Sequence, residues 1–281
     1  MARTVPLARF GARAARGLAR KPAPARSPGY RRWACLGAVL GALGALSLFA
    51  PAAWLAAGIA KASAGQVVLA DPRGTVWDGS AQLVLTGGAN SSDATALPER
   101  VLWTLWPSLE GLRGEVRPTC CSALPAQVLA SARWGAARLE VSSLKLNLPA
   151  PLLAGLGTPW NTLNLQGQLL LVANTLSLDW VQGRAQLDGS ATLDMTEVSS
   201  RLSTLRPLGD YRLSLTGGAA PTVQLQTLQG ALQLSGSGQW VGSRMRFSGE
   251  ASAAPDREAA LSNLLNIIGR RQGAKSLISL G

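Results

Sequence analysis

The sequence predicts a mainly β protein: a single N-terminal transmembrane helix followed by an antiparallel β-sheet domain with a few short helices. Three observations lead to this prediction. The chain has no charged residue between Trp33 and Ala60. Beyond Lys61, apolar and polar residues alternate almost to the end of the chain, with the period of two that is typical of strands with one buried face. Glycines separate the alternating runs, as in a meander of short hairpins.

Residues 1–32 form a basic segment that we expect to be disordered and cytoplasmic. The 281-residue chain has 27 Lys and Arg against 15 Asp and Glu, a formal net charge of +12. Most of this excess comes from residues 1–32, which include no acidic residue. Arg-rich segments beside a membrane helix stay cytoplasmic and favour anionic lipid. The charge therefore predicts contact with membrane lipid and not with nucleic acid, because a DNA-binding domain would spread basic residues over a folded face.

Residues 33–60 are predicted to be the transmembrane helix, since about 20 apolar residues suffice to cross the hydrocarbon core. Pro51 would kink or mark its outer end. A cleavable signal peptide is one alternative, because Ala62-Ser63-Ala64 fits a small-x-small cleavage site, although the apolar stretch of a signal peptide is shorter. A buried core helix is the other alternative. An anchor with a cytoplasmic N-terminus places residues 61–281 outside the cytoplasm.

Gly37 and Gly41 are candidate contact residues within the predicted membrane helix. They lie among Ala34, Ala38 and Ala42. Small residues at this spacing let two membrane helices approach closely. An Ala- and Gly-rich sequence also contains such spacings by chance, so both interpretations stay open.

The strands of the domain are predicted from residues of alternating character. The separating residues are mostly Gln, Ser, Thr, Asn, Asp and Arg. The parity of the apolar residues changes between Leu225 and Leu228, which predicts a turn or bulge near Thr227. The clearest alternating runs are Leu144 to Leu148, Leu163 to Leu171, Leu176 to Trp180, Ala185 to Met195, Tyr211 to Leu215 and Leu232 to Leu234.

The best helical pattern lies near the C-terminus, from Asp256 to Ile268. Leu261, Leu264, Leu265 and Ile268 recur at helical spacing, with acidic residues in the first turn and a glycine after the last. This stripe predicts a helix laid on a sheet face. Shorter helical turns are expected at residues 107–112, 124–131 and 149–156.

Weak internal similarity predicts two related sheet units. Gly79–Leu83 recurs as Gly189–Leu193, and Trp103–Pro107 recurs in outline as Ser203–Pro207. The predicted units are residues 61–157 and residues 158–281. The alternative is chance, because strands rich in Gly, Leu and Ser resemble one another.

Several classes of chemistry are excluded by composition. The sequence has no histidine, so catalytic triads with His and His-containing zinc sites are ruled out. Of its three cysteines, Cys35 lies in the predicted membrane helix, and Cys120 and Cys121 are adjacent. We interpret the adjacent pair as partly buried thiols. A strained vicinal disulfide, or pairing with another chain, is the alternative in an oxidising compartment.

No enzymatic activity, catalytic residue, metal site or cofactor is predicted. Asp188 and Asp194 could flank a glycosidic bond, but their even spacing on a strand is typical of a solvated sheet surface. Trp77, Trp103 and Trp106 could form a platform for sugar or peptide, whereas aromatic residues in strands usually belong to the core. The sequence also lacks phosphate-loop and zinc-binding motifs.

Several local motifs resemble those of the type II secretion system protein N family. They are Asp71–Gly79, Val101–Pro107, Arg206–Tyr211, Leu225–Trp240 and Phe247–Gly249, in the family's order. The resemblance covers residues 34–281, whereas the Arg- and Pro-rich residues 1–30 are atypical of the family. The residues that carry the resemblance as structural motifs are Gly74, Trp77, Gly79, Pro207, Gly209, Tyr211, Gly236 and Trp240.

The resemblance implies a single-pass protein of the bacterial inner membrane, with a periplasmic domain and no catalytic residues. We expect a non-catalytic accessory component of the type II protein secretion machinery that docks onto other subunits of that machinery, including through exposed strand edges. The alternative is a membrane-anchored, β-rich carrier or binding protein for lipid or another hydrophobic ligand. A packed, closed sheet interior favours docking, and an open apolar groove favours carriage.

Overall fold

A computed structural model of the chain describes residues 28–88, 91–181, 184–242 and 244–280. Almost all of the predicted basic segment, residues 1–32, lies outside these ranges. The chain divides into two compact units, Met1–Ser47 and Leu48–Gly281, which are described separately.

Helix α1 (Pro28–Leu48) is the described element of the first unit. Large apolar side chains along it are exposed to at least half of their maximum, including Trp33, Leu40 and Leu43. The helix ends at Leu48 and not at residue 60, so residues 33–60 do not form one continuous helix. Within the described part of the chain, no helix combines the length and the apolarity needed to cross a membrane.

The rest of the predicted span is a separate element of the second unit. Pro51 has an extended backbone and precedes helix α2 (Ala52–Ala62). A proline disfavours helical conformation in the residue before it and lacks an N–H, which explains the break. Ala52 and Ala56 are buried against the sheet. Helix α2 therefore packs one face on the sheet, while its Trp54 is exposed.

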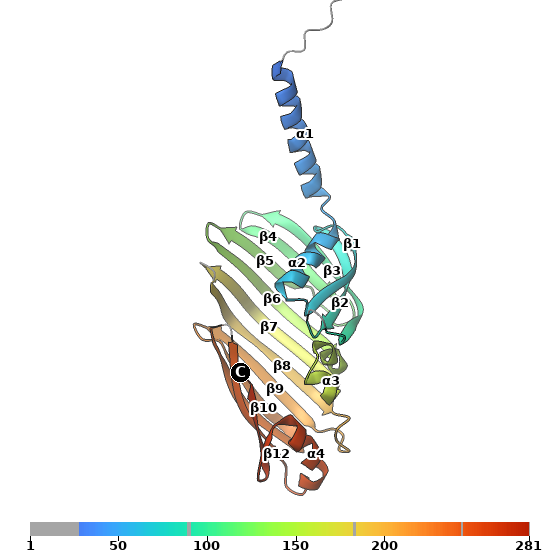
Figure 1. Cartoon of the computed structure of the whole chain (residues 1–281), viewed down its shortest axis with the longest axis vertical. Coiled ribbons are helices and arrows are strands. Elements are labelled where there is room, and N and C mark those ends of the chain that lie inside the picture. The colour runs from blue at the N-terminus through green and yellow to red at the C-terminus, as the bar shows by residue number, and fades with distance from the viewer. Residues whose placement is uncertain (1–27, 89–90, 182–183, 243, 281) are drawn as a thin grey trace, which may run out of the picture. The chain divides into compact units, whose positions relative to one another are not determined.

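A single antiparallel sheet of 14 strands forms the second unit (Figure 1). Strands β1 to β12 follow the order of the chain, and β14 and then β13 complete the sheet. The predicted mainly β, antiparallel class is confirmed. The strands are β1 (Val67–Gly74), β2 (Asp78–Thr86), β3 (Ala94–Ser108), β4 (Gly111–Pro118), β5 (Ala126–Arg133), β6 (Ala136–Pro149), β7 (Gln166–Val181), β8 (Arg184–Ser199), β9 (Gly209–Gly218), β10 (Thr222–Gly230), β11 (Leu232–Val241), β12 (Arg244–Ala253), β13 (Arg270–Gln272) and β14 (Lys275–Leu280).

The change of parity in β10 has the predicted cause. The register between β9 and β10 shifts between Thr227 and Gln229, so a bulge returns the apolar residues to one face. The hydrogen-bonded sheet runs without a break from β6 to β7, across the proposed boundary at residues 157 and 158. The division into two related sheet units stays a prediction.

The connections between strands differ at the two ends of the strands. One end, which we call the short-turn edge, has the turns after β1, β3, β5, β7, β9 and β11. The connections after β2, β4, β6 and β8 lie at the opposite edge, the long-loop edge, together with 3-10 helix η1 (Ala150–Leu156) and helix α3 (Trp160–Leu163). Helix α4 (Glu258–Ile268) follows β12 there.

The predicted helical elements are partly correct. Helix α4 matches the prediction for residues 256–268, and η1 matches the turn expected at residues 149–156. Residues 107–112 form the β3–β4 hairpin and residues 126–131 belong to β5, so those two helical turns were wrong. Both segments satisfy their backbone groups by strand pairing.

The core lies at the two ends of the strand order, on one face of the sheet. Over β1 to β4, helix α2 packs near Leu69 and Trp103, and Leu152 of η1 packs with Leu97 and Val101. Over β8 to β12, helix α4 packs its Leu261, Leu264 and Leu265 with Val198, Leu208, Tyr211, Leu232 and Ala251. The face between these two ends has no helix from the described core clusters over it.

Candidate functional site

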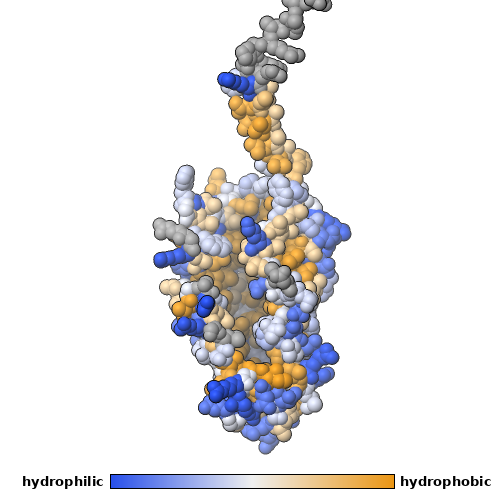
Figure 2. All heavy atoms as spheres, in the orientation of Figure 1, coloured by the Kyte–Doolittle hydropathy of each residue, from blue (hydrophilic) through white to orange (hydrophobic). Residues whose placement is uncertain are grey.

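The middle of the apolar face is the feature best suited to bind a partner or ligand. Its side chains are half-buried and belong to none of the three core clusters. Figure 2 shows a hollow in this part of the sheet, with a floor of mainly apolar residues. We call these residues the open apolar face: Val128, Leu139, Val141, Leu144, Leu146, Leu171, Leu176, Leu178, Leu187, Leu193, Leu213 and Leu215.

Strand register aligns part of the open apolar face into a continuous row. Leu146 pairs with Leu171, and Leu171 pairs in turn with Leu193. Leu193 pairs with Leu213, and Leu213 with Leu225. Residues directly opposite in register share a face. Because neighbouring strands lie about 4.8 Å apart, five strands carry this leucine row over roughly 20 Å.

Helix α4 closes one end of the hollow through both apolar and polar contacts. Leu261 and Leu265 are fully buried, and Ser276 donates a hydrogen bond from its Oγ to the Leu265 carbonyl at 2.6 Å. Tyr211 donates from its hydroxyl to the Leu232 carbonyl at 3.1 Å. Burial, with a smaller contribution from Asp210, raises the pKa of the Tyr211 phenol. Tyr211 therefore stays neutral and acts as a core residue.

The opposite face of the sheet is polar and carries structural ion pairs. Arg212 donates from Nε and a terminal nitrogen to the two carboxylate oxygens of Asp194, at 2.6 and 2.7 Å. Hydrogen bonding from Arg212 lowers the pKa of the Asp194 carboxyl, against the opposing effect of burial. Asp188 instead accepts from Gln186. A carboxylate held in such a pair is a poor proton donor, so this geometry does not resemble a glycosidase pair.

The acidic and cysteine side chains of the described residues do not gather into a metal centre. No group of three or more His, Cys, Asp or Glu side chains lies close enough to hold a metal ion there. The short ion pairs between Asp71 and its neighbours Arg73 and Arg100 are exposed. Hydrogen bonds from these two arginines lower the pKa of the Asp71 carboxyl.

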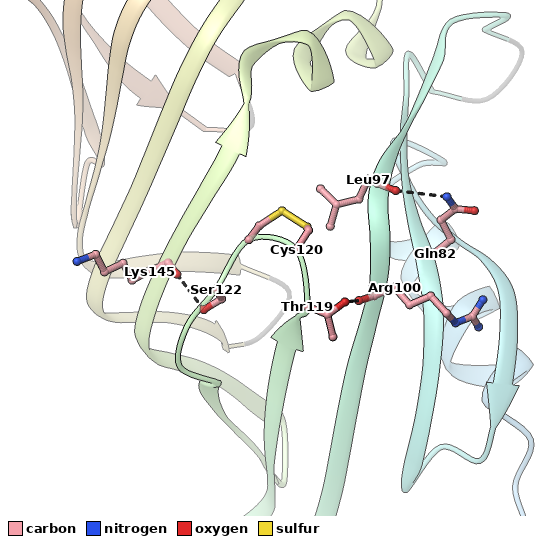
Figure 3. The surroundings of a disulfide bond; sticks show 8 residues. Gln82, Leu97, Arg100, Thr119, Cys120, Ser122 and Lys145 are labelled. Carbon is pink, nitrogen blue, oxygen red and sulfur yellow. Dashed lines mark hydrogen bonds between the residues drawn. A yellow bond between two sulfur atoms is a disulfide. The ribbon is translucent and has the colours of Figure 1, made fainter.

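Cys120 and Cys121 form a vicinal disulfide in the turn between β4 and β5 (Figure 3). The interpretation of the pair as two thiols is therefore wrong, and the vicinal alternative is correct. Cys121 is buried beside Leu97 and Leu152, and its carbonyl accepts from the Asn147 backbone N–H at 2.7 Å. Cys120 is partly buried against the same cluster, so the pair borders the core beside η1. Cys35 is a free, exposed cysteine.

The motif residues of the first strands shape the β1–β2 turn. Gly74 has a φ of +86°, and a Cβ there would lie 2.5 Å from the Asp78 carbonyl oxygen. Gly79 lies against the Trp103 ring, where a Cβ would also be 2.5 Å away. Trp103 is buried and donates from Nε1 to the carbonyls of Thr75 and Val76. The Trp103 side chain thus ties the turn to the core and is not available as a binding platform.

The second group of motif residues lies at the long-loop edge. Pro207 is exposed and borders a recess of about 380 Å³ that Arg206 and Arg257 also line. Gly209 is buried close to the Tyr211 hydroxyl and to Gly230. Pro207 and Gly209 thus lead into the core that α4 covers.

The remaining motif residues occupy β11, the β1–β2 turn and helix α1. Gly236 lies against the ring of Phe247, where a Cβ would be 2.5 Å from the ring. Trp240 is half-buried near the end of β11, and Trp77 is half-buried in the β1–β2 turn. A Cβ added at Gly37 or Gly41 of α1 would meet nothing within 4 Å among the described residues. Their role as helix contacts stays a prediction, and the sheet motifs belong to the other compact unit.

Sequence reasoning did not single out the open apolar face as a site. Leu146, Leu171 and Leu193 were assigned to the buried faces of strands, which is correct for their direction. Alternation cannot show that none of the helices in the described core clusters covers the middle of that face. The only available signal was the shortage of helical patterns: a face spanning this many strands needs more cover than the helices near 149–156 and 256–268 supply.

The family model for protein N of the type II secretion system (T2SS) matches residues 65–277. Neither the curated proteins nor the solved structures gave a significant match. The matched residues run from just before β1 into β14 and so include the whole open apolar face. The chain belongs to the type II secretion system protein N family.

Proposed function

We propose that the protein is a non-catalytic component of the type II secretion machinery in the bacterial envelope, held at the inner membrane by α1 and acting through its sheet in the periplasm. The observation that carries this proposal is the family match over residues 65–277. The absence of histidine from the sequence supports a non-catalytic role, because histidine is the usual acid–base group near neutral pH.

Anchoring by α1 is supported by the side chains that this helix exposes. Trp33, Leu36, Leu40 and Leu43 are each more than half exposed, and apolar side chains of this size favour lipid over water. The basic residues that precede the helix favour a cytoplasmic N-terminus and contact with anionic lipid. Because α1 falls short of a membrane-crossing helix, the proposal needs a direct test.

Topology is tested with alkaline phosphatase fused to the C-terminus and with carbonate washing of membranes. The proposal predicts an active fusion and a full-length protein that stays in the membrane pellet. A soluble, processed protein beginning at Gly65 would show that the N-terminal segment is a signal peptide. An inactive fusion would show that the sheet does not reach the periplasm.

Docking onto other secretion subunits is supported by an unpaired strand edge. Among the described residues, β13 pairs with Lys275–Leu277 of β14, and no strand pairs with the corresponding side of Ile278–Leu280. Exposed backbone N–H and C=O groups can accept an added strand. This unpaired segment is short and lies at the end of the sheet, which suits pairing with a short segment of a partner subunit.

Crosslinking in intact cells tests this docking edge. A photoreactive residue at Ser279 of β14 is expected to capture another secretion subunit. The matched control is Ser235, an exposed serine in β11, which has strands on both sides. Equal capture at both positions, or capture at Ser235 alone, would argue against strand addition at β14.

Carriage of lipid or another hydrophobic ligand is a second candidate function. It is favoured by the open apolar face, since an exposed contiguous apolar patch commonly marks a binding surface. A photoreactive residue at Leu213 samples this face, and one at Ser214 samples the opposite face of the same strand. Lipid adducts at Leu213 but not at Ser214 would support carriage. Protein adducts at Leu213 would show that a partner subunit covers the face instead.

A further inference from the structure

The short-turn edge carries apolar residues that a water-facing edge would not be expected to expose. Leu109 and Trp134, at the tips of the β3–β4 and β5–β6 hairpins, have relative exposures of 108% and 105%. Trp180 and Val181, beside the β7–β8 turn, and Val241, beside the β11–β12 turn, are 41–51% exposed. We call these five residues the hairpin fringe. Single exposed apolar residues are common, but several at the hairpin tips of one edge mark an interaction surface.

Basic side chains accompany the hairpin fringe. Arg133 precedes Trp134, and Arg184 and Arg244 begin the strands that follow Val181 and Val241. All three are exposed, and none forms an ion pair with another described residue. Arg113 and Arg138, by contrast, pair with Glu110 and with Glu140 and Asp179. The fringe therefore combines exposed apolar tips with positive charge that no carboxylate neutralises.

The chain enters the sheet unit at this same edge. The Val76 backbone N–H donates to the Ala50 carbonyl at 2.8 Å, and Pro51 bridges to Thr75. Thr75 and Val76 form the β1–β2 turn, which is a turn of the short-turn edge. The segment that follows α1 therefore enters the unit at the fringe edge and not at the long-loop edge. In Figure 1 the hairpin ends of β5 and β7 lie at the upper left of the sheet, away from α3 and α4.

We propose that the hairpin fringe docks onto the surface of an anionic membrane. Tryptophan prefers the membrane–water interface, where its ring meets both apolar and polar groups. Arginine beside it is attracted to anionic head groups. A protein partner would more often present carboxylates to arginine. An anionic bilayer offers both an interface for the exposed indole and anionic head groups for the guanidinium. The proposal rests on the proposed anchoring, because the chain from the anchor joins the sheet unit at this edge.

Quenching by brominated lipids tests this docking in the full chain reconstituted into vesicles of phosphatidylcholine and phosphatidylglycerol. Bromine near the carboxyl end of the acyl chains should quench Trp134. The amount of fluorescence that the bromolipid removes, per mole of protein, should therefore fall in Trp134→Phe. The matched control is Trp160→Phe, a 36% exposed tryptophan in α3 at the long-loop edge, which should lower the total fluorescence but leave the amount that is quenched unchanged.

A charge variant tests the electrostatic half of the proposal. Replacing Arg133, Arg184 and Arg244 with Gln should weaken docking by roughly fivefold for each arginine, and only when phosphatidylglycerol is present. Equal quenching in Trp134→Phe and in the unchanged chain would overturn the proposal. Trp33 lies in α1, so the quenching that is lost in Trp33→Phe measures insertion of the anchor separately. If Trp33 is quenched and Trp134 is not, then α1 inserts but the fringe does not dock.

Discussion

Helices α1 and α2 divide the uncharged stretch from Trp33 to Ala60 between them, yet they have different surroundings. In α1 the large side chains from Trp33 to Leu48 are exposed. In α2 the small side chains of Ala52 and Ala56 are buried on strands β1 and β2, while Trp54 is exposed. Both helices are apolar, so hydropathy does not distinguish them. The difference lies in position, because Pro51 begins a new helix beside the sheet, on which Ala52 and Ala56 pack.

The same contrast appears in the sheet. Its apolar face is covered where α2, η1 and α4 pack on it, and is open between them. Leucines in register with one another therefore contribute differently to stability, according to whether a helix covers them. Substitutions paired across this contrast can confirm it or show that it is wrong.

A charge placed in each of the two helices should have the largest effect. Ala56→Asp would bury an unpaired carboxylate between α2 and the sheet, and should lower the free energy of unfolding by about 3–5 kcal/mol. Leu43→Asp should leave the unfolding of the sheet unit unchanged but oppose membrane insertion by about 2.5–3.5 kcal/mol. Urea titration followed by tryptophan fluorescence measures the first effect, and carbonate extraction the second.

Each variant is expected to change one property and not the other: Ala56→Asp changes the unfolding of the sheet unit, and Leu43→Asp changes membrane insertion. If Leu43→Asp destabilised the sheet as much as Ala56→Asp, then α1 would pack on protein and not on lipid. If Ala56→Asp had no effect on unfolding, the burial of α2 against the sheet would be incorrect.

The next largest effect is expected when leucines in the covered and open parts of the apolar face are replaced by alanine, because the two replacements should lower the free energy of unfolding by different amounts. Leu264→Ala, in α4, removes a side chain that is 2% exposed and should cost about 2–5 kcal/mol, including the cavity left behind. Leu193→Ala, in the open apolar face, should cost less than about 1.5 kcal/mol, because that side chain is only half-buried. Urea unfolding of both variants measures the difference. Equal costs would mean that the middle of the face is covered in solution.

Much of the sheet is predictable from the sequence because each strand has one apolar and one polar face. The alternation around Leu144 to Leu148 fits a strand, because only a strand places all of these leucines on one buried face. The bulge near Thr227 follows from the same argument, since a change of parity needs an extra residue. The helix at residues 258–268 was likewise predictable from the spacing of Leu261, Leu264 and Leu265.

Long-range arrangement was less predictable. The break between α1 and α2 depends on Pro51 together with a sheet on which Ala52 and Ala56 can pack, and only the proline is visible in the local sequence. The uncovered middle of the sheet results from where α2, η1 and α4 lie after folding. The segment at residues 107–112, predicted as a helical turn, is a hairpin, which depends on the pairing of β3 with β4.

Two serines in the same strand give a smaller contrast between covered and open positions. Ser276 is fully buried and donates to the Leu265 carbonyl of α4, whereas Ser279 is exposed. Ser276→Ala should lower the free energy of unfolding by about 1–2 kcal/mol, since it leaves a buried carbonyl without this donor. Ser279→Ala should have almost no effect. Thermal unfolding of both variants measures the contrast, and equal shifts would mean that the serine does not hold α4 to the sheet.

The smallest expected effect is that of the Asp194–Arg212 pair on the polar face. The pair is partly exposed, with side-chain exposures of 22% and 41%, so Asp194→Asn should cost less than about 1 kcal/mol at neutral pH. Arg212 lowers the pKa of the Asp194 carboxyl in the folded protein. A carboxyl with a lowered pKa stabilises the fold above its unfolded pKa, and this contribution disappears as the pH falls through the folded value.

The difference in unfolding free energy between the natural chain and Asp194→Asn should therefore shrink as the pH is lowered below the usual carboxyl range near 4. It should also shrink at high salt, because exposed ion pairs are screened. Urea titrations at several pH values measure both trends. A difference that did not change with pH would mean that hydrogen bonding to Arg212 does not depend on the charge of Asp194. The polar face would then contribute to stability through geometry alone, while the covered ends of the apolar face remain the main source of stability.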